Sequence, residues 1–244
     1  MRSSGAGSII VSVVVLLLVW GARAEPVAAI GPASKVHLAQ LVLPGGKATR
    51  TRGLAALAGA LTRRTNITMQ RGVKRFGPQS TSLFRMPLLF TTADGPLPLL
   101  KPAAVTRLRR HLSRGGTWII DGPASGSQRA AFRASAGHVA KQLFPRQSLK
   151  ALPTSHTLWK AFYLLSPDHF QRASLPVEAV VRDGRATILV VQGLTAAPGA
   201  VLGRLPEWLT RLAVNLVMYA LCVDYKSDQV HAPIIMRRRR WRVP

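Results

Sequence analysis

Asp121 and His156 are the residues whose type and position most suggest chemistry. Asp121 directly follows an apolar run, residues 117–120, that is typical of a buried strand, and His156 lies in a loop further along the chain. An acid that ends a buried strand beside a histidine can act as a general base or as half of a metal site. Asp121 can equally cap the next helix or bond loop N–H groups, and His156 can be an ordinary loop residue. Both are catalytic candidates whose role the sequence leaves open.

Two glycines and a second acid extend this candidate set. Gly45, Gly46 and Asp94 each follow a segment expected to be a strand, as Asp121 does. Ligands of open parallel sheets bind at the carboxyl ends of the strands, so these four residues predict a small-molecule site. The glycine pair lacks the Lys-Ser/Thr of a phosphate loop and the Gly-x-Gly-x-x-Gly of a dinucleotide site, and we expect no cofactor. With one cysteine in the chain, a cysteine-rich zinc module is excluded and no metal site is indicated.

Composition indicates a folded domain with a basic surface. The 244 residues include 34 Lys+Arg and 9 Asp+Glu, which gives a formal net charge of +25, and 48% of the residues are hydrophobic. That hydrophobic share is too high for a disordered basic tail, and a single cysteine excludes a disulfide framework. The length is ample for one well-buried domain.

The N-terminus has the features of an export signal. Arg2 precedes an apolar stretch, Ile9 to Trp20, and Ala22-Arg23-Ala24 has the small-x-small form of a cleavage site. We predict a signal peptide over residues 1–24 with cleavage after Ala24. An uncleaved anchor is the alternative, although the apolar stretch is shorter than the ~20 residues that span a bilayer. A Pro- and Ala-rich linker, residues 25–34, is expected to follow, then a domain over residues 35–232 and a basic tail over residues 233–244.

The elements that must position the candidate residues alternate between strands and helices. Helical spacing of leucines predicts a helix ending at Arg63-Arg64, and further helices are expected from Lys101 to Arg114 and from the loop after Asp121 to about Leu143. Strands are expected between them, at residues 36–42, 66–68, 86–91 and 117–121. Such alternation implies a mostly parallel sheet with right-handed crossovers.

The pattern loosens after Pro145. A loop is expected at residues 152–156, a short strand at 161–165, and two strands, 178–182 and 186–192, around the hairpin signal Arg182-Asp183-Gly184-Arg185. These strands are expected to extend the sheet at its edge. A last helix, about residues 206–223, is apolar nearly all round and is therefore either buried or covered by a partner. It contains Cys222, which we interpret as a buried, inert thiol.

Several motifs resemble a bacterial family called domain of unknown function 4159. The resemblance spans most of residues 35–240 and rests on four segments, Gly115–Asp121, Leu152–His156, Asn215–Leu221 and Tyr225–His231. It implies a flavodoxin-like three-layer α/β sandwich similar to class I glutamine amidotransferases, with no established activity. It also implies an envelope protein that works alongside ATPase and von Willebrand-type partners. Gly122 and Thr157 depart from the family, which often has a second Asp and a Pro there, and this weakens the transfer of a paired-acid site.

Amidotransferase chemistry needs a nucleophile on a sharp turn between strand and helix, with a histidine and an oxyanion hole. The turn after Ile120 contains no cysteine, and Ser125 lacks the Gly-x-Ser-x-Gly spacing of a nucleophile elbow. The missing nucleophile argues against glutaminase catalysis.

The C-terminal tail supplies a second kind of candidate surface. It combines cations with one aromatic ring, in Arg237, Arg238, Arg239, Arg240, Trp241 and Arg242. Such a segment attracts anionic lipid headgroups or an acidic partner, and it can also be a solvated terminus. No nucleic-acid-binding motif accompanies it, which argues against sequence-specific nucleic-acid recognition.

Together these features predict an exported, periplasmic or secreted α/β domain that acts as a non-catalytic binding or assembly module of the cell envelope. Its expected partner is an envelope protein or an anionic membrane surface. A small-molecule ligand is an open alternative. The alternative is a hydrolase-like enzyme with a crevice site around Asp121 and His156.

Overall fold

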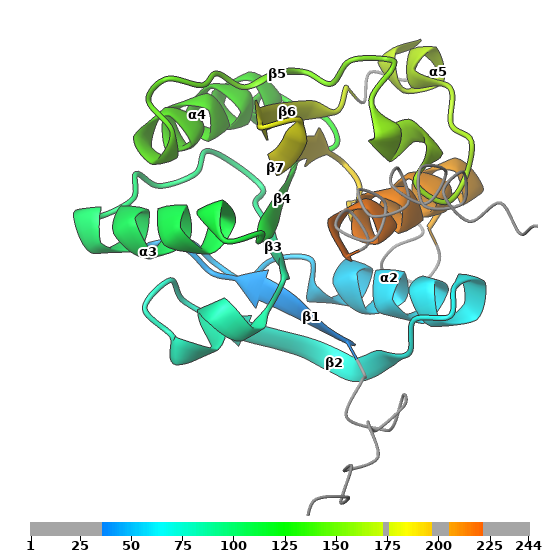
Figure 1. The fold of residues 1–244 in the computed structure, drawn as a ribbon, viewed down its shortest axis with the longest axis horizontal. Coiled ribbons are helices and arrows are strands. Elements are labelled where there is room, and N and C mark those ends of the chain that lie inside the picture. Colours follow the sequence, from blue (N-terminus) through cyan, green and yellow to red (C-terminus); the bar gives the residue numbers. More distant parts are fainter. Residues whose placement is uncertain (1–35, 173–175, 197–204, 222–244) are drawn as a thin grey trace, which may run out of the picture. The chain divides into compact units, whose positions relative to one another are not determined.

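A mostly parallel sheet forms the centre of the domain. The computed structural model describes residues 36–172, 176–196 and 205–221. Within these residues the sheet has seven strands in the order β2-β1-β3-β4-β7-β6-β5 (Figure 1). The first five in this order are mutually parallel, namely β2 (Met69–Phe76), β1 (Val36–Leu41), β3 (Leu88–Thr92), β4 (Thr117–Gly122) and β7 (Arg185–Gln192). This is the flavodoxin-like order, and it confirms the expected fold class.

Two antiparallel strands complete one edge of the sheet, which confirms the expected antiparallel additions, although β5 was not predicted and the predicted strand 186–192 lies inside the sheet. β6 (Glu178–Arg182) pairs with β7, and the two-residue β5 (Lys150–Ala151) pairs with β6. Asp183 and Gly184 join β6 to β7 with φ angles of 49° and 76°. Positive φ at both central residues is the geometry of a type I′ hairpin, which explains the Asp-Gly pair at this turn.

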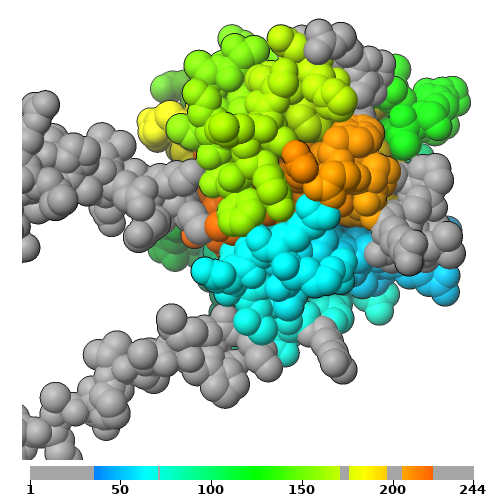
Figure 2. Space-filling view, turned by 90° about the vertical axis from the view of Figure 1, so that its right-hand side faces the viewer, coloured from blue at the N-terminus to red at the C-terminus, as the bar shows by residue number. Residues whose placement is uncertain are grey.

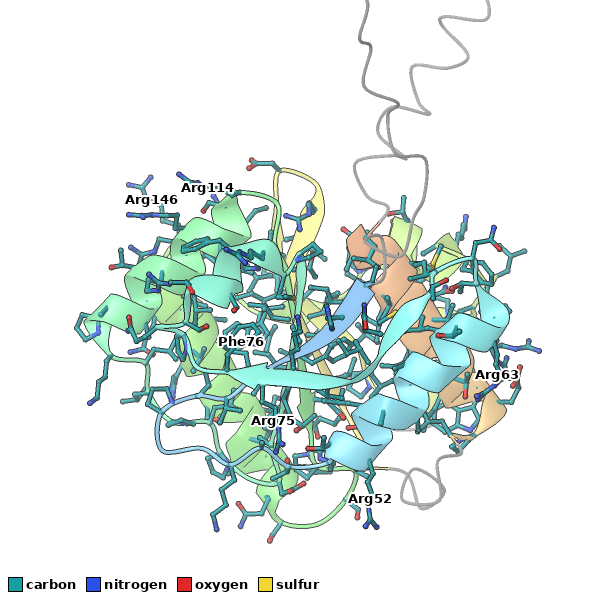
Figure 3. All side chains as sticks on the ribbon, turned by 90° about the horizontal axis from the view of Figure 1, so that it is seen from below. Arg52, Arg63, Arg75, Phe76, Arg114 and Arg146 are labelled. Carbon is teal, nitrogen blue, oxygen red and sulfur yellow. The ribbon has the colours of Figure 1, made fainter. Side chains whose placement is uncertain are left out.

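Helices cover both faces of the sheet, and alternate strand residues point to opposite faces. Ile119 packs with α2 (Thr51–Arg64) and with a final helix, residues 207–221, whereas Trp118 and Ile120 pack with α3 (Pro102–Ser113) and α4 (Gln128–Leu143). The view along the β2 edge shows α2 on one side of the sheet and the other two helices opposite (Figure 3). Strands buried on both faces need continuous apolar runs, which is why β3 and β4 were predictable.

The final helix is buried in this domain. Leu212, Leu216 and Tyr219 are each at most 5% exposed and belong to the core on the α2 face. Of the two interpretations of its apolar surface, burial is therefore correct over residues 207–221.

The prediction of a short strand at residues 66–68 is wrong, because the strand there is β2, which begins at Met69. β2 is an edge strand in which Gly72 has a φ of 85° and the pairing with β1 is interrupted by a bulge. An edge strand that carries Lys74 and Arg75 lacks the apolar pattern on which the prediction depended.

The prediction of a strand at residues 161–165 is also wrong. This segment contains bends and lies between a short 3-10 helix, η3 (Thr157–Lys160), and α5 (Pro167–Arg172). The side-chain amide of Asn215 takes the place of a neighbouring strand. Its Oδ1 accepts the Tyr163 N–H at 2.7 Å, and its Nδ2 donates to the carbonyl oxygens of Tyr163 and Leu158 at 2.8 and 2.9 Å. The segment alternates between inward and outward side chains without joining the sheet.

The predicted signal peptide, linker and basic tail, together with Cys222, lie outside the described residues. Among the helices that the structure describes, none is long and apolar enough to cross a membrane.

Candidate functional site

A crevice opens where the strand order of the sheet changes direction. β1 lies between β2 and β3, and the chain leaves the carboxyl ends of β1 and β3 next to each other. This switch point is where doubly wound sheets bind ligands. The crevice has a volume of about 270 Å³ and is lined by residues 41–43, 46, 47, 49 and 91–98.

The wall of the crevice is held by buried hydrogen bonds. Gln40, which is 1% exposed, donates through Nε2 to Thr92 Oγ1 and to the Thr49 carbonyl oxygen, both at 2.9 Å. Thr92 Oγ1 in turn donates to the Thr49 carbonyl oxygen at 2.6 Å. These bonds tie β1 and β3 to the segment that precedes α2, so the crevice has a preformed polar wall.

Asp121 lies at the carboxyl end of β4 and is completely buried. Its Oδ1 accepts the Leu194 N–H at 2.9 Å. Its Oδ2 accepts the N–H and hydroxyl of Thr195, at 2.8 and 2.5 Å, and Nη1 of Arg50 at 3.1 Å. We call Asp121 and these three partners the Asp121 clasp. It joins β4 to the loop after β7 and to the beginning of α2.

The electrostatics of the Asp121 clasp combine opposing effects. Burial raises the pKa of the Asp121 carboxyl, while the Arg50 charge and the hydrogen bonds from Thr195 and Leu194 act to lower that pKa. All four contacts are N–H or O–H donors, so the geometry matches an ionised carboxylate with both oxygens occupied.

Arg50 is the central residue of this edge, and the sequence analysis did not identify it. It adopts the left-handed conformation, with φ 53° and ψ 30°, immediately before α2. Its guanidinium donates to the backbone oxygens of Asp121 and Gly122, at 2.8 and 2.9 Å, and to that of Ala93. A non-glycine residue in this conformation is strained, and such strain clusters at functional or tightly packed sites.

Arg50 also connects the two predicted acids. Its Nε lies 3.1 Å from Asp94 Oδ1, although this N–H makes no hydrogen bond, and its Nη1 bonds Asp121. The Asp94 side chain is 61% exposed, in contrast to the buried Asp121. The structure therefore brings both acids to one guanidinium. Asp94 faces the crevice, and Asp121 lies beneath the surface.

The predicted glycines lie beside the crevice. Gly46 lines it, and Gly45 occupies the adjacent turn with a φ of 82°. Gly46 N–H donates to the Leu43 carbonyl oxygen at 2.9 Å, which closes the turn. Of the four predicted ligand-binding residues, Gly46 and Asp94 face the crevice, Gly45 adjoins it, and Asp121 does not reach its surface.

His156 lies elsewhere. Its Nδ1 accepts the Leu158 N–H at 3.2 Å, and its ring packs on Tyr219, with ring centroids 5.2 Å apart. The Tyr219 hydroxyl accepts the N–H of Ala186 at the beginning of β7, whereas Asp121 pairs with Val191. Ala186 and Val191 are five positions apart along the strand, about 16 Å. The structure does not bring His156 and Asp121 together.

The His156 side chain is partly buried. Burial lowers its pKa, and Nε2 is buried without a hydrogen-bond partner in the described part of the chain.

Gly122 is closely packed by an aromatic ring. A Cβ atom at this position would lie 2.2 Å from Cε1 of Phe132 on α4. Phe132 thus fills the space that a side chain after Asp121 would need. In the described residues, no group of three or more His, Cys, Asp or Glu side chains is arranged to hold a metal ion.

No local pattern in the sequence indicates the other partners of Asp121 and the crevice wall. Arg50 is one of 34 basic residues, and Thr195 and Gln40 are common polar types in unremarkable contexts. Their importance arises from contacts with residues distant in sequence.

Comparison with family models matches residues 37–221 to a domain of unknown function, DUF4159. The match covers well over half of the chain and runs from β1 into the final helix. No curated protein matches the chain.

Proposed function

The chain belongs to the DUF4159 family, and we propose that it is a non-catalytic binding or assembly module of the cell envelope. The observation that carries the proposal is the saturation of Asp121. A general base needs a free lone pair within reach of the substrate, and Asp121 is 0% exposed with both oxygens accepting hydrogen bonds. The acid that the fold places at the strand end serves to hold three segments together.

The crevice between β1 and β3 supports a binding role. It combines a preformed polar wall with the exposed carboxylate of Asp94 and the exposed side chain of Lys47. Most ligand sites are preformed hollows with a few fixed polar groups, and this crevice has that character. We propose Gly45, Gly46 and Asp94 as its contact residues, toward a small polar ligand or a projecting group of an envelope protein.

The hydrolase-like alternative requires Asp121 and His156 to share a crevice. The opposite positions of these residues along β7 disfavour it. Two parts of the proposal rest on the sequence alone. One is export through residues 1–24, and the other is capture of an envelope partner or an anionic membrane by the basic tail.

Capture from native cell envelope tests the proposed function. We would attach a tag to residues 25–244, expose the protein to solubilised envelope, and wash at low and then high salt, because a basic chain collects polyanions through screened attraction. The proposal expects a defined envelope component to survive the high-salt wash.

Two acid substitutions provide a matched comparison for this capture. Asp94→Asn changes the crevice and is expected to reduce capture, whereas Asp183→Asn alters an exposed acid in the turn between β6 and β7 and should not. If nothing is retained at high salt, or if both variants behave like the wild type, the crevice is not the binding site and the proposal fails.

A further inference from the structure

A short loop presents two apolar side chains to solvent. In residues 161–166, hereafter the exposed loop, Phe162 is 44% exposed and Leu164 is 85% exposed. Their neighbours Ala161, Tyr163 and Leu165 point inward and pack against the core. The two outward side chains therefore project from one side of the loop.

The exposed loop is held firmly in this conformation. The Asn215 amide bonds both the N–H and the carbonyl of Tyr163, and the Leu165 N–H donates to the Trp159 carbonyl oxygen at 2.8 Å. The Phe162 ring also packs edge-on against the Tyr163 ring, with centroids 4.9 Å apart. Because the loop is already ordered, little conformational entropy is lost when Phe162 and Leu164 enter another apolar medium.

Basic side chains lie on the same face as the exposed loop. Lys160 precedes it, and the guanidinium of Arg211 lies 5.4 Å from the centre of the Tyr163 ring. The last turn of α2 contributes Arg63 and Arg64, and Figure 3 shows Arg63 projecting outward from that helix. Figure 2 shows α2 (cyan), the final helix (orange) and the yellow-green segment that contains the exposed loop side by side on one face.

The acids on this face are fewer and partly neutralised. Glu207 pairs with Arg64 at 2.5 Å and with Arg211 at 2.8 Å, and these hydrogen bonds lower the pKa of Glu207 to about 2. Among the described residues, Asp168 of α5 is the other nearby acid. In this part of the chain four basic side chains thus stand against two acidic ones, which favours an anionic partner and opposes a second copy of the same surface.

We propose that the exposed loop inserts Phe162 and Leu164 into the headgroup region of an anionic lipid bilayer while the cations on the same face contact lipid phosphates. Protruding apolar side chains beside cations bind membranes in this way, because apolar burial and attraction to anionic lipid add together. This inference deepens the proposed function, on whose envelope location it rests, by assigning a membrane-facing surface separate from the crevice.

Vesicle binding by residues 25–244 tests the inference. Co-sedimentation would compare phosphatidylcholine vesicles with vesicles in which about a third of the lipid is phosphatidylglycerol. We expect binding to the anionic vesicles. The double variant Phe162→Ser/Leu164→Ser should reduce it about tenfold or more, from the lost burial of two apolar side chains.

A matched control and a gain-of-binding variant accompany this test. Leu99 is 69% exposed in the connection before α3, and Leu99→Ser should leave vesicle binding unchanged. Leu164→Trp should strengthen binding, because tryptophan favours the membrane interface. That variant keeps the test decisive even if the double serine variant folds poorly.

Equal binding by the double serine variant and the wild type, or no gain for Leu164→Trp, overturns the inference and assigns membrane attraction to charge alone. The capture experiment with Asp94→Asn tests the proposed function separately. Asp94-dependent capture that persists without loop-dependent vesicle binding overturns only the membrane surface, and the opposite pattern overturns only the crevice.

Discussion

Replacing Asp121 with asparagine tests whether the Asp121 clasp is structural. The substitution preserves shape but removes the charge and one acceptor oxygen. Asparagine can direct its carbonyl toward Thr195 and Arg50, and its NH₂ group then faces the Leu194 N–H, donor against donor. Arg50 retains Asp94 as an ionic partner, and that carboxylate is 61% exposed.

The cost of Asp121→Asn can be worked from these contacts. Removing one partner of a buried ion pair costs about 3–5 kcal/mol, and an unsatisfied buried donor alone costs about 1–3 kcal/mol. Because Arg50 keeps its bonds to three backbone carbonyls, we expect the lower part of the first range, about 3–4 kcal/mol. Asp94→Asn breaks an ion pair of the same guanidinium at an exposed position and should cost about 0–1 kcal/mol.

Urea unfolding followed by far-ultraviolet circular dichroism measures both variants. With a slope of about 2 kcal/mol per molar urea, the midpoint should fall by about 1.5–2 M for Asp121→Asn and by less than about 0.5 M for Asp94→Asn. Thr195→Val, which removes only the hydroxyl donor to Asp121, should cost about 1 kcal/mol and serves if Asp121→Asn does not fold. An unchanged or higher midpoint for Asp121→Asn would refute the reasoning, since functional acids typically reduce stability and structural ones increase it.

Three further predictions concern packing and pH. Gly122→Ala should lower the free energy of unfolding by about 1–3 kcal/mol, because the new Cβ atom collides with Phe132. Gly137→Ala lies in open space on α4 and should raise that free energy by about 0.5–1 kcal/mol. Thermal unfolding compares the two variants, and equal effects would contradict the packing argument. Asn215→Leu should lower the free energy of unfolding by at least about 3 kcal/mol, because three hydrogen bonds to the backbone are lost. The same change should expose residues 161–166 to protease. If limited proteolysis leaves this loop uncut, Asn215 does not tether it. Burial, with a smaller contribution from Arg185, lowers the pKa of His111 to about 4, so the unfolded chain binds the additional proton below its own pKa of 6.5. Stability should therefore fall by about 2–3 kcal/mol between pH 6.5 and 4, and His111→Leu should flatten this urea-unfolding profile; an equally steep profile in the variant would assign the effect to other groups.

The buried part of the fold could be predicted because it depends on local patterns. β3 and β4 are continuous apolar runs, which strands covered on both faces require. The hairpin between β6 and β7 needs two residues with positive φ, and Asp183-Gly184 supplies them. In these elements the sequence determines the structure within a few neighbouring residues.

The missed elements depend on tertiary contacts. β2 is a strand because β1 pairs with it, and its glycine and cations give no apolar alternation of their own. The segment at residues 161–165 has the opposite property, since it alternates like a strand but its backbone is bonded by the Asn215 side chain. A pattern within one segment cannot indicate which distant group will satisfy its backbone.

The candidate site shows the same division. The position of Asp121 at a strand end followed from the apolar run before it, but its partners Arg50, Leu194 and Thr195 lie 71 to 74 residues away along the chain. Arg50 could not be singled out because nothing local distinguishes it from other arginines. Burial decides whether the Asp121 carboxylate can reach a substrate or only holds segments of the fold together. Burial is a property of the assembled fold and not of the local sequence.

Gly122 explains why this edge would not readily become a paired-acid site. The family resemblance implies that a second Asp is frequent after Asp121, yet here Phe132 occupies the space that its side chain would need. Restoring the acid would require both Gly122→Asp and Phe132→Ala, and the second change alone removes a fully buried ring at a cost of about 3–5 kcal/mol. The strand end in this chain is thus committed to packing through Phe132 and to the Asp121 clasp. We propose recognition at two other surfaces, the crevice at Asp94 and the exposed loop at Phe162 and Leu164.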